Sequence, residues 1–155
     1  MSINYRFAQL TDSLIVLNWR NEESVRHSSR SGDLISIDQH NLWFGARVIN
    51  IHNEPILIFS SENVDIGFTR LDILDAVKGI VEISIVVVAD LRNKGFGSLM
   101  LDATIKVART LLGVNEISAT VREDNQASLK LFMASGFSYF ASNSGFVELR
   151  FSLLE

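Results

Sequence analysis

One stretch decides the fold, Ile83-Ser84-Ile85-Val86-Val87-Val88-Ala89-Asp90-Leu91-Arg92-Asn93-Lys94-Gly95-Phe96-Gly97-Ser98. Its first half is apolar and rich in β-branched residues, which favours a strand. After the stretch, apolar side chains recur at helical spacing, at Leu101, Ile105, Ala108 and Leu112. The sequence therefore predicts a strand, a glycine-rich basic turn and a helix, in that order.

The turn has the properties of an anion site. Gly95 and Gly97 allow a tight backbone turn and leave amide N–H groups uncovered by side chains. A helix start adds unpaired N–H donors and a positive dipole end, and Arg92 and Lys94 add charge. We interpret the turn as a pyrophosphate cradle, with plain turn chemistry as the alternative. It is neither a P-loop, because no Gly-Lys-Ser/Thr follows, nor a dinucleotide fingerprint, whose third glycine would fall at Met100.

Composition excludes several classes of function. The chain has 155 residues, 47% hydrophobic and 21% charged, which is typical of one globular domain spanning residues 1–155. The net charge of −4 argues against nucleic-acid binding, and the absence of cysteine excludes disulfides and a thiol nucleophile. The histidines show no metal-ligand spacing, so we expect no metal. Without a signal-peptide pattern or a long apolar run, we expect a cytoplasmic protein that does not contact membranes.

The remaining pattern predicts a mixed sheet flanked by helices. Strands are expected over residues 3–9, 56–59, 65–72, 80–88, 116–121, 137–140 and 146–153. Helices are expected over residues 14–27, 36–48, 98–112 and 125–135, the last capped by Asp124 or Asn125. The order β-α-α-β-β-β-α-β-α-β-β indicates an α/β (α+β) fold with about seven strands and about four helices.

Two motifs resemble the GNAT N-acetyltransferase family. The family's Arg/Gln-x-x-Gly-x-Gly/Ala pattern is met by Arg92, Gly95 and Gly97. Residues 125–137 are similar to the family's Asn-x-x-Ala/Ser-x-x-Leu-Tyr-x-x-x-Gly-Phe segment. Both motifs occur in the right order and spacing, and the resemblance covers essentially the whole chain. It implies a GNAT-like, mostly antiparallel sheet that splays between its fourth and fifth strands.

The resemblance implies acetyl-CoA as the co-substrate. The backbone of the fourth strand is expected to pair with the pantetheine arm, at Ile85, Val86 and Val87. The pyrophosphate is expected on the amides of the turn, near Arg92, at Asn93, Lys94, Gly95, Phe96, Gly97 and Ser98. Asn125 is expected to contact the coenzyme from the other side of the cleft, and a plain helix cap is the alternative for that residue.

Acetyl transfer to an amine by direct attack requires a base, because an alkyl amine has a pKa of about 10.4. Glu82 is the carboxylate within the central strand, and we predict that it is this base. A structural carboxylate, bonded to the neighbouring strand or to Lys or Arg, is the alternative. The backbone N–H of Val86 or Val87 is expected to stabilise the oxyanion.

The general acid is unassigned, because Phe132 stands where many family members have a tyrosine. A phenyl ring donates no proton, so Phe132 is expected to pack beside the coenzyme. The candidate proton sources for the thiolate are water, Tyr139, Ser128 and Ser135.

The acceptor is indicated by Trp19-Arg20-Asn21 together with His40 and the aromatic residues that follow it. This pattern resembles a subgroup that acetylates nucleotide-linked amino sugars, as in pseudaminic-type sugar synthesis, or the N-termini of ribosomal proteins. Trp19, Arg20, Asn21 and His40 are therefore predicted to bind substrate, by stacking on a base and binding phosphates. The alternative is that Trp19 and Trp43 are core residues.

The sequence favours a nucleotide-linked amino sugar over a protein N-terminus or another small amine. A non-catalytic acetyl-CoA-binding module is the alternative from another class, supported by the phenylalanine at position 132. Apolar strand residues near the C-terminus are candidates for pairing subunits in a homodimer.

Overall fold

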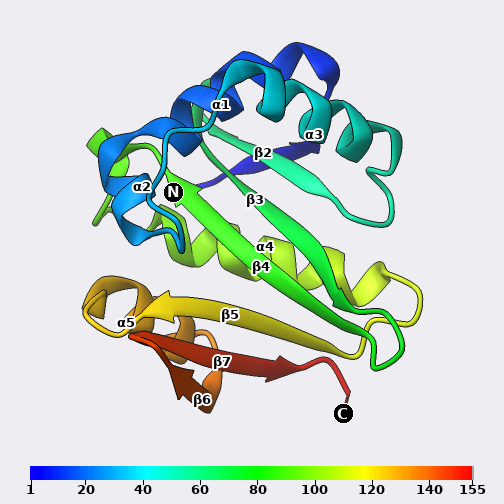
Figure 1. The fold of residues 1–155 in the computed structure, drawn as a ribbon, viewed down its shortest axis with the longest axis vertical. Coiled ribbons are helices and arrows are strands. Elements are labelled where there is room, and N and C mark those ends of the chain that lie inside the picture. The colour runs from blue at the N-terminus through cyan, green and yellow to red at the C-terminus, as the bar shows by residue number, and fades with distance from the viewer. Residues whose placement is uncertain (155) are drawn as a thin grey trace.

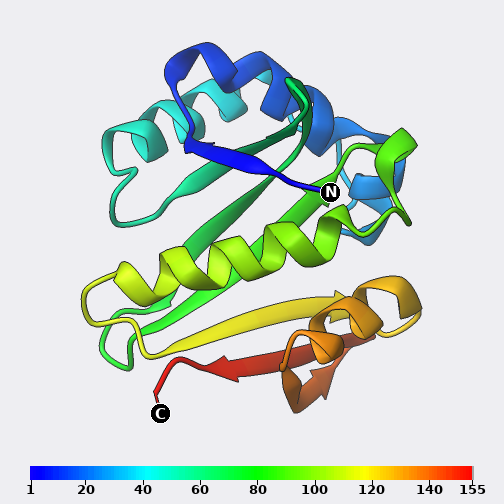
Figure 2. The same cartoon turned by 180° about the vertical axis from the view of Figure 1, so that it is seen from behind.

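The computed structural model describes residues 1–154 and contains one seven-stranded sheet with helices on both faces (Figures 1 and 2). The strand order is β1-β2-β3-β4-β5-β7-β6. The strands are β1 Asn4–Phe7, β2 Ile56–Ser61, β3 Val64–Asp75, β4 Ile80–Val87, β5 Glu116–Arg122, β6 Ser138–Asn143 and β7 Phe146–Ser152. Only β4 and β5 pair in parallel within this sheet of the described residues; the other neighbours are antiparallel. The mixed, mostly antiparallel sheet predicted from the sequence is confirmed.

The helices cover the two faces of the sheet with separate cores. They are α1 Ser13–Asn21, α2 Glu23–Ser28, α3 Ile37–Ile49, α4 Phe96–Thr110 and α5 Gln126–Ala134, and short 3-10 turns occupy Leu10–Asp12 and Ala89–Leu91. Val16 of α1 and Phe44 of α3 pack on Phe68 of β3. On the opposite face, α4 and α5 pack on the strands through Leu101 and Phe132. No helix within residues 1–154 combines the length and apolarity needed to cross a membrane.

The helix expected over residues 14–27 is two helices, α1 and α2, separated at Glu22. Glu22 adopts an extended conformation, with φ −57° and ψ 137°. This conformation lets its carboxylate accept hydrogen bonds from Ser24 Oγ at 2.6 Å and from Arg92 Nη2 at 3.2 Å. The helical spacing of apolar residues continues across Glu22, so it does not indicate the break. The contact with Arg92 that accompanies the break is distant in the sequence.

The fourth and fifth strands separate after three paired residues. Ile80, Val81 and Glu82 pair with the first three residues of β5, and beyond Glu82 the two strands diverge (Figure 1). In contrast, β4 stays paired with β3 along its whole length, from Ile80 to Val87. The expected splay is confirmed, and it leaves one edge of β4 without a strand partner from residue 83 onward.

The direction of the β4 peptide groups follows from two hydrogen bonds. Val88 N–H donates to Ile66 O of the β3 side at 2.9 Å, whereas Gly79 O accepts from Asn115 N on the β5 side at 2.7 Å. Peptide groups alternate along a strand, so even-numbered residues of β4 bond to β3 and odd-numbered residues face the opening. The peptide groups of Ile85 and Val87 therefore point towards the separated edge.

Candidate active site

A cleft of about 850 Å³ lies where β4 and β5 separate. It is lined by β4, by the turn before α4, by the start of α5 and by the segment from α1 to the loop before α3. The two motif segments that are far apart in the sequence both contribute to this lining, with Arg92, Asn93, Gly95, Gly97 and Ser98 from the first and Asn125, Ala127, Ser128, Leu131 and Phe132 from the second. The structure therefore brings the two motifs together around one space.

The turn before α4 presents unbonded amides. Asn93 and Gly95 adopt left-handed conformations, with φ 61° and φ 88°, and α4 then begins at Phe96. The first backbone amide after the turn with an acceptor is that of Leu99, which donates to Gly95 O at 3.5 Å. Within residues 1–154, the amides of residues 93–98 have no hydrogen-bond acceptor. Such a run of free donors at the start of a helix fits a diphosphate.

Glycine is favoured at position 97 by the closeness of neighbouring side chains rather than by the backbone conformation. A Cβ at Gly97 would lie 3.3 Å from Leu131 Cδ2 of α5 and 3.9 Å from Val87 Cγ2 of β4. At Gly95 a Cβ would meet nothing closer than 4.0 Å, so the glycine is favoured there by its positive φ. The two glycines of the motif therefore serve different purposes, one shaping the turn and one keeping the cleft open beside α5.

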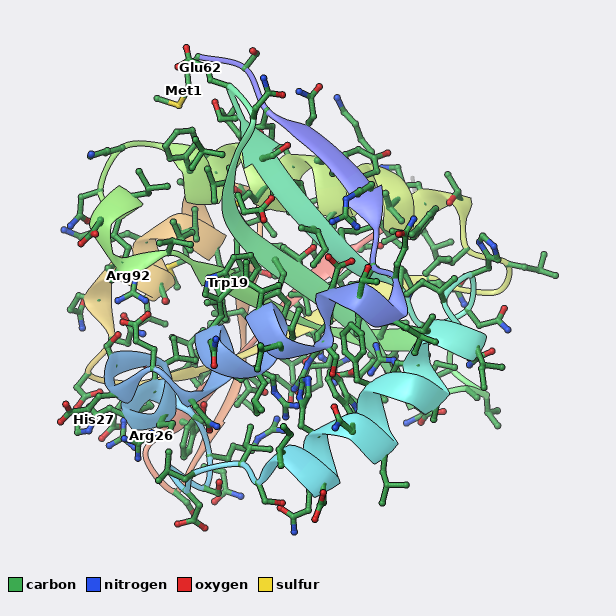
Figure 3. The ribbon with its side chains drawn as sticks, turned by 90° about the horizontal axis from the view of Figure 1, so that it is seen from above. Met1, Trp19, Arg26, His27, Glu62 and Arg92 are labelled. Carbon is green, nitrogen blue, oxygen red and sulfur yellow. The ribbon has the colours of Figure 1, made fainter. Side chains whose placement is uncertain are left out.

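Arg92 is bound to the protein on three sides. Its Nε donates to Val87 O at 3.0 Å, Nη1 to Ser24 Oγ at 2.7 Å and Nη2 to Glu22 Oε2 at 3.2 Å. Figure 3 shows the Arg92 side chain between α2 and the loop that leads to α4. The first bond caps the carbonyl group of the open β4 edge at Val87. The other two join the turn to the start of α2, so Arg92 connects the two sides of the cleft.

Asn125 and Phe132 both line the cleft from α5. Asn125 Oδ1 accepts a hydrogen bond from Ser128 N at 3.2 Å, which makes Asn125 the N-cap of the helix. The cap uses the carbonyl oxygen, so the amide group of the same side chain remains a donor. Phe132 is buried and packs edge-on against Phe137, with ring centroids 5.1 Å apart. Contact of either residue with a coenzyme stays a prediction.

Glu82 lies on β4 with its side chain 12% exposed, and it lines the cleft. Its Oε2 accepts hydrogen bonds from Arg30 Nη2 at 2.7 Å and from Thr120 Oγ1 at 3.0 Å. Arg30 comes from the loop after α2 and is 62% exposed, whereas Thr120 belongs to β5. The partners are those of a structural carboxylate, and the position beside the cleft is the one that a base requires. The catalytic role of Glu82 stays a prediction.

Of the four predicted substrate residues, Arg20 lines the cleft and the other three support its wall. Trp19 stacks on Phe68 with ring centroids 6.0 Å apart, which agrees with a core role. Asn21 forms two hydrogen bonds with the backbone of Ile35: its Nδ2 donates to Ile35 O and its Oδ1 accepts from Ile35 N, both at 2.8 Å. His40 is fully buried. Substrate contact by Trp19, Asn21 and His40 stays a prediction.

His40 is held in its neutral form. Its Nε2 lies 2.8 Å from Ser13 O, and its Nδ1 lies 3.1 Å from Arg20 Nη1. An arginine donates only, so Nδ1 accepts and Nε2 carries the hydrogen that is donated to Ser13. Burial lowers the pKa of His40, the bond to Ser13 opposes this shift, and the charge of Arg20 adds to it. The neutral ring orients Arg20 towards the cleft.

Several residues that lie on the same face as Glu82 were not predicted from the sequence. Arg70 of β3 lines the cleft, and Asp72 lies opposite Glu82 in the register of β3 and β4. The available signal was the alternation Phe68, Arg70, Asp72, in which the strand places two charged residues on one face with a core aromatic residue. Arg30 and Thr120 carried no local signal, because they meet Glu82 through tertiary packing.

Comparison with known proteins agrees with this geometry. A protein-family model described as "Acetyltransferase (GNAT) domain" matches residues 4–138. The chain is 27% identical over 139 residues to the L-amino acid N-acyltransferase MnaT of Escherichia coli, covering 87% of this chain and 79% of that protein. It is 26% identical over 146 residues to Acetyltransferase PseH of Campylobacter jejuni, covering 90% and 87%. A Sinorhizobium meliloti phosphinothricin acetyltransferase, solved with acetyl-CoA, shares the fold with a TM-score of 0.83 and 19% identity, covering 99% of this chain and 89% of that one.

Proposed function

The chain belongs to the GNAT family of acetyltransferases, and from this premise we propose that it transfers the acetyl group of acetyl-CoA to the primary amine of a small acceptor. One observation carries the proposal. A single cleft is lined by Asn93, Gly95, Gly97 and Ser98 of the segment with unbonded amides, by the open edge of β4 and by Glu82. An anion site, an unpaired strand edge and a carboxylate are the three elements that binding the donor and deprotonating the amine require.

The donor side of the proposal uses main-chain groups. Bound acetyl-CoA would supply a thioester, with its pyrophosphate on the amides of residues 93–98 and its amide-containing arm along the open edge of β4. Ile85 and Val87 present their peptide groups to that edge, whereas the peptide group of Val86 bonds to β3, because peptide groups alternate along the strand. We therefore assign oxyanion stabilisation to the N–H of Val87 or Ile85 rather than that of Val86.

The acceptor side uses Glu82. Glu82 Oε2 accepts a hydrogen bond from the cationic Arg30 Nη2 at 2.7 Å, so this oxygen is placed to accept one from the ammonium group of the acceptor as well. In the proposed step, the ammonium group displaces the exposed Arg30 side chain and transfers one proton to Glu82. The neutral amine nitrogen then forms a bond to the acetyl carbon, the carbon–sulfur bond breaks, and the electron pair of that bond leaves on the thiolate. The nitrogen loses its second proton to water, which gives the neutral amide.

The proton for the thiolate does not require a side chain at position 132. A thiol has a pKa of about 8.5, so the thiolate is a tolerable leaving group at neutral pH and takes its proton from water. Of the side chains considered from the sequence, Ser128 lines the cleft, and Tyr139 and Ser135 are not among its lining residues. Ser128 therefore remains the candidate side-chain donor.

Among acceptors, we propose a nucleotide-linked amino sugar. A hollow of about 310 Å³ adjoins the cleft, and its lining includes the basic side chains of Arg26, His27 and Arg122 as well as Glu23. Guanidinium groups bind phosphates through paired N–H donors, so this rim suits a diphosphate. A protein N-terminus or another small amine is the alternative acceptor. A non-catalytic acetyl-CoA-binding module is the alternative from another class, favoured by the buried Phe132.

The test is release of free thiol from acetyl-CoA by the purified protein, with UDP-linked 4-amino sugars, amino acids, polyamines and N-terminal peptides as acceptors. The proposal predicts release that depends on one class of acceptor and follows saturation kinetics. Binding of acetyl-CoA without thiol release on any amine would support the module instead. No binding of acetyl-CoA would refute both.

A further inference from the structure

Three arginines surround one aromatic ring at the acceptor end of the cleft. The guanidinium carbons of Arg20, Arg70 and Arg47 lie 4.3, 5.2 and 5.4 Å from the centroid of the Trp43 ring. The arginines come from α1, β3 and α3 respectively, so the cluster is formed by tertiary packing. Cations favour the face of an aromatic ring, but a ring supplies no countercharge.

The cluster has more positive charge than its carboxylate can balance. Asp72 forms ion pairs with Arg47 and with Arg70, and Arg20 has no carboxylate partner within residues 1–154. Three arginines against one aspartate leave a charge of +2, from 3 − 1, because His40 is neutral. The nearby carboxylate of Glu82 is already paired with Arg30.

Arg47 and the other two arginines differ in their hydrogen bonds. Arg47 donates to Glu54 O at 3.1 Å and to Leu71 O at 2.8 Å, in addition to its bond with Asp72, so the fold fully occupies it. Arg70 donates no hydrogen bond within residues 1–154: its Nε is buried and forms an ion pair with Asp72 Oδ2 at 3.2 Å, and its terminal nitrogens have no acceptor. Arg70 therefore keeps donor capacity that the folded chain does not use.

The excess charge is partly buried. Burial lowers the pKa of Arg20 to about 10, and the charge of Arg70 is the next cause, opposed by Asp72. Arg20 is still charged at neutral pH. Holding two like charges away from water is unfavourable unless an anion joins them.

Arg20 and Arg70 line the cleft, whereas Arg47 does not. Arg70 lies opposite Ser84 in the β3–β4 register, so it shares a face with Glu82 as a diagonal neighbour. Diagonal neighbours in an antiparallel pair are about 7–8 Å apart, a distance that one small molecule spans. We infer that Arg20 and Arg70 form an oxyanion subsite for the acceptor, binding its carboxylate or phosphate while its amine meets Glu82.

This inference rests on the proposed function and narrows it. An acceptor without an anionic group, such as a polyamine or an amino-acid amide, leaves the two arginines unpaired. A carboxylate of an amino acid and a phosphate of a sugar nucleotide both provide the oxygens that a guanidinium binds in pairs. The chemistry of the subsite is the same in both cases, and the experiment separates the two sources.

The experiment measures kcat/KM by thiol release for two matched pairs of acceptors. One pair is L-methionine and L-methioninamide; the other is a UDP-linked 4-amino sugar and the methyl glycoside of that sugar. The wild-type protein is expected to prefer the anionic member of one pair, which identifies the source. Arg70→Met is expected to lower kcat/KM for that member by about 10- to 100-fold, the scale of one or two charge-assisted hydrogen bonds, and to leave the neutral member unchanged. Arg70→Lys is expected to retain part of the preference.

Two controls keep the result interpretable. Lys106→Met removes one positive charge from the exposed face of α4, outside the cleft, and is expected to change neither acceptor. Arg20→Met tests the subsite independently if Arg70→Met does not fold. Equal kcat/KM for both members of each pair in the wild type, or an equal loss for both in Arg70→Met, would overturn the subsite while acetyl transfer stands.

A binding measurement separates failure of the subsite from failure of the proposed function. Calorimetric titration of the wild-type protein and Arg70→Met with the same four compounds requires no turnover. Binding of an anionic member to the wild type, weakened about 10-fold or more in Arg70→Met, supports the subsite even if no thiol is released. No difference between the two proteins for either anionic member overturns it.

Discussion

The two sides of the cleft, which we propose bind the donor and the acceptor, differ in the groups that they present. The donor side, residues 83–98 and 125–132, presents main-chain groups: the open β4 edge and the free amides before α4. The acceptor side presents the side chains of Arg20, Arg30, Arg70 and Glu82, which come from α1, a loop, β3 and β4. A backbone site depends on conformation and tolerates changes in most side chains. A side-chain site depends on the identity of each residue, so substitution affects the two sides differently.

The largest effect is expected from Gly97→Glu on the donor side. A carboxylate beside the free amides occupies the space of the pyrophosphate and repels it, and such like-charge contacts cost several kcal/mol, so acetyl-CoA binding is expected to weaken more than about 100-fold. Calorimetry with acetyl-CoA measures this change. Gly45→Glu is the matched control, because Gly45 lies in α3 without a positive φ, and a Cβ there would meet nothing within 4 Å. If Gly97→Glu binds acetyl-CoA with unchanged affinity, the turn at residues 93–98 does not bind the pyrophosphate.

The next effect is expected from Glu82→Gln on the acceptor side. A general base contributes about 10²- to 10⁴-fold, so kcat is expected to fall by at least about 100-fold with the KM for acetyl-CoA unchanged. Raising the pH is expected to restore part of the rate, because more of the acceptor amine is then neutral. Steady-state kinetics across pH measure both effects. Glu116→Gln is the control, since Glu116 pairs with Arg150 outside the cleft, and a rate profile of Glu82→Gln equal to that of the wild type would refute the base.

A smaller effect is expected from Arg30→Gln. In the proposed mechanism the exposed Arg30 competes with the acceptor for Glu82. Exposed ion pairs contribute about 0.2–1 kcal/mol, so the acceptor KM is expected to fall by up to about fivefold. Steady-state kinetics with the acceptor as the varied substrate provide the measurement. Arg6→Gln breaks an ion pair with Asp12 away from the cleft and is expected to leave KM unchanged. A raised KM would mean that Arg30 binds the acceptor instead of competing with it.

The smallest effect concerns stability and pH. Because burial lowers the pKa of His40 below its ordinary value of 6.5, the unfolded chain binds more protons than the folded chain just below that pH. The contribution of His40 to the free energy of unfolding is therefore constant above about pH 6.5 and falls as the pH drops from 6.5 towards the folded pKa. His40→Gln is expected to flatten this decline in Tm between pH 8 and pH 5, where about 2–4 °C corresponds to 1 kcal/mol.

Asp12 provides an internal reference for the pH experiment. The hydrogen bond from Arg6 is the main cause that lowers the pKa of Asp12, burial opposes it, and the Gln9 N–H assists it. A lowered carboxylate pKa gives stability that is present above the ordinary value of 3.8 and is lost as the pH falls through the folded pKa. A decline above pH 5 that persists unchanged in His40→Gln would contradict the assignment to His40.

The sequence predicted the local structure of residues 83–98 better than it predicted which side chains meet on the arginine-rich side of the cleft, for a physical reason. The free amides at residues 93–98 belong to one contiguous strand–turn–helix unit, and the conformation of Gly95 follows from local chemistry. The hydrogen bonds of Arg92 did not follow, because its partners Glu22 and Ser24 lie 70 and 68 residues away. The break at Glu22 was missed for the same reason.

On the proposed acceptor side, the residues that line the cleft are determined by the packing of elements that are far apart in the sequence. Arg70 reaches the cleft through the register of β3 against β4, in which it lies opposite Ser84. A register shift between Ile73 and Asp75 follows it, and no local pattern in the sequence indicates that shift. Asn21 carried a signal in the sequence, yet its hydrogen bonds are with the backbone of Ile35. The short motif therefore indicated the region but not the role of its residues.

The proposed function depends above all on the open edge of β4 and the amides before α4 holding acetyl-CoA. Residue-resolved amide hydrogen exchange, measured with and without acetyl-CoA, tests this directly. We expect acetyl-CoA to slow exchange at Ile85, Val87 and residues 93–98, and to change Ser84 and Val86 little, because their amides already bond to β3. Exchange at residues 93–98 that does not change when acetyl-CoA is added would contradict the proposed donor site. So would an equal slowing of exchange by acetyl-CoA at odd and even residues of β4.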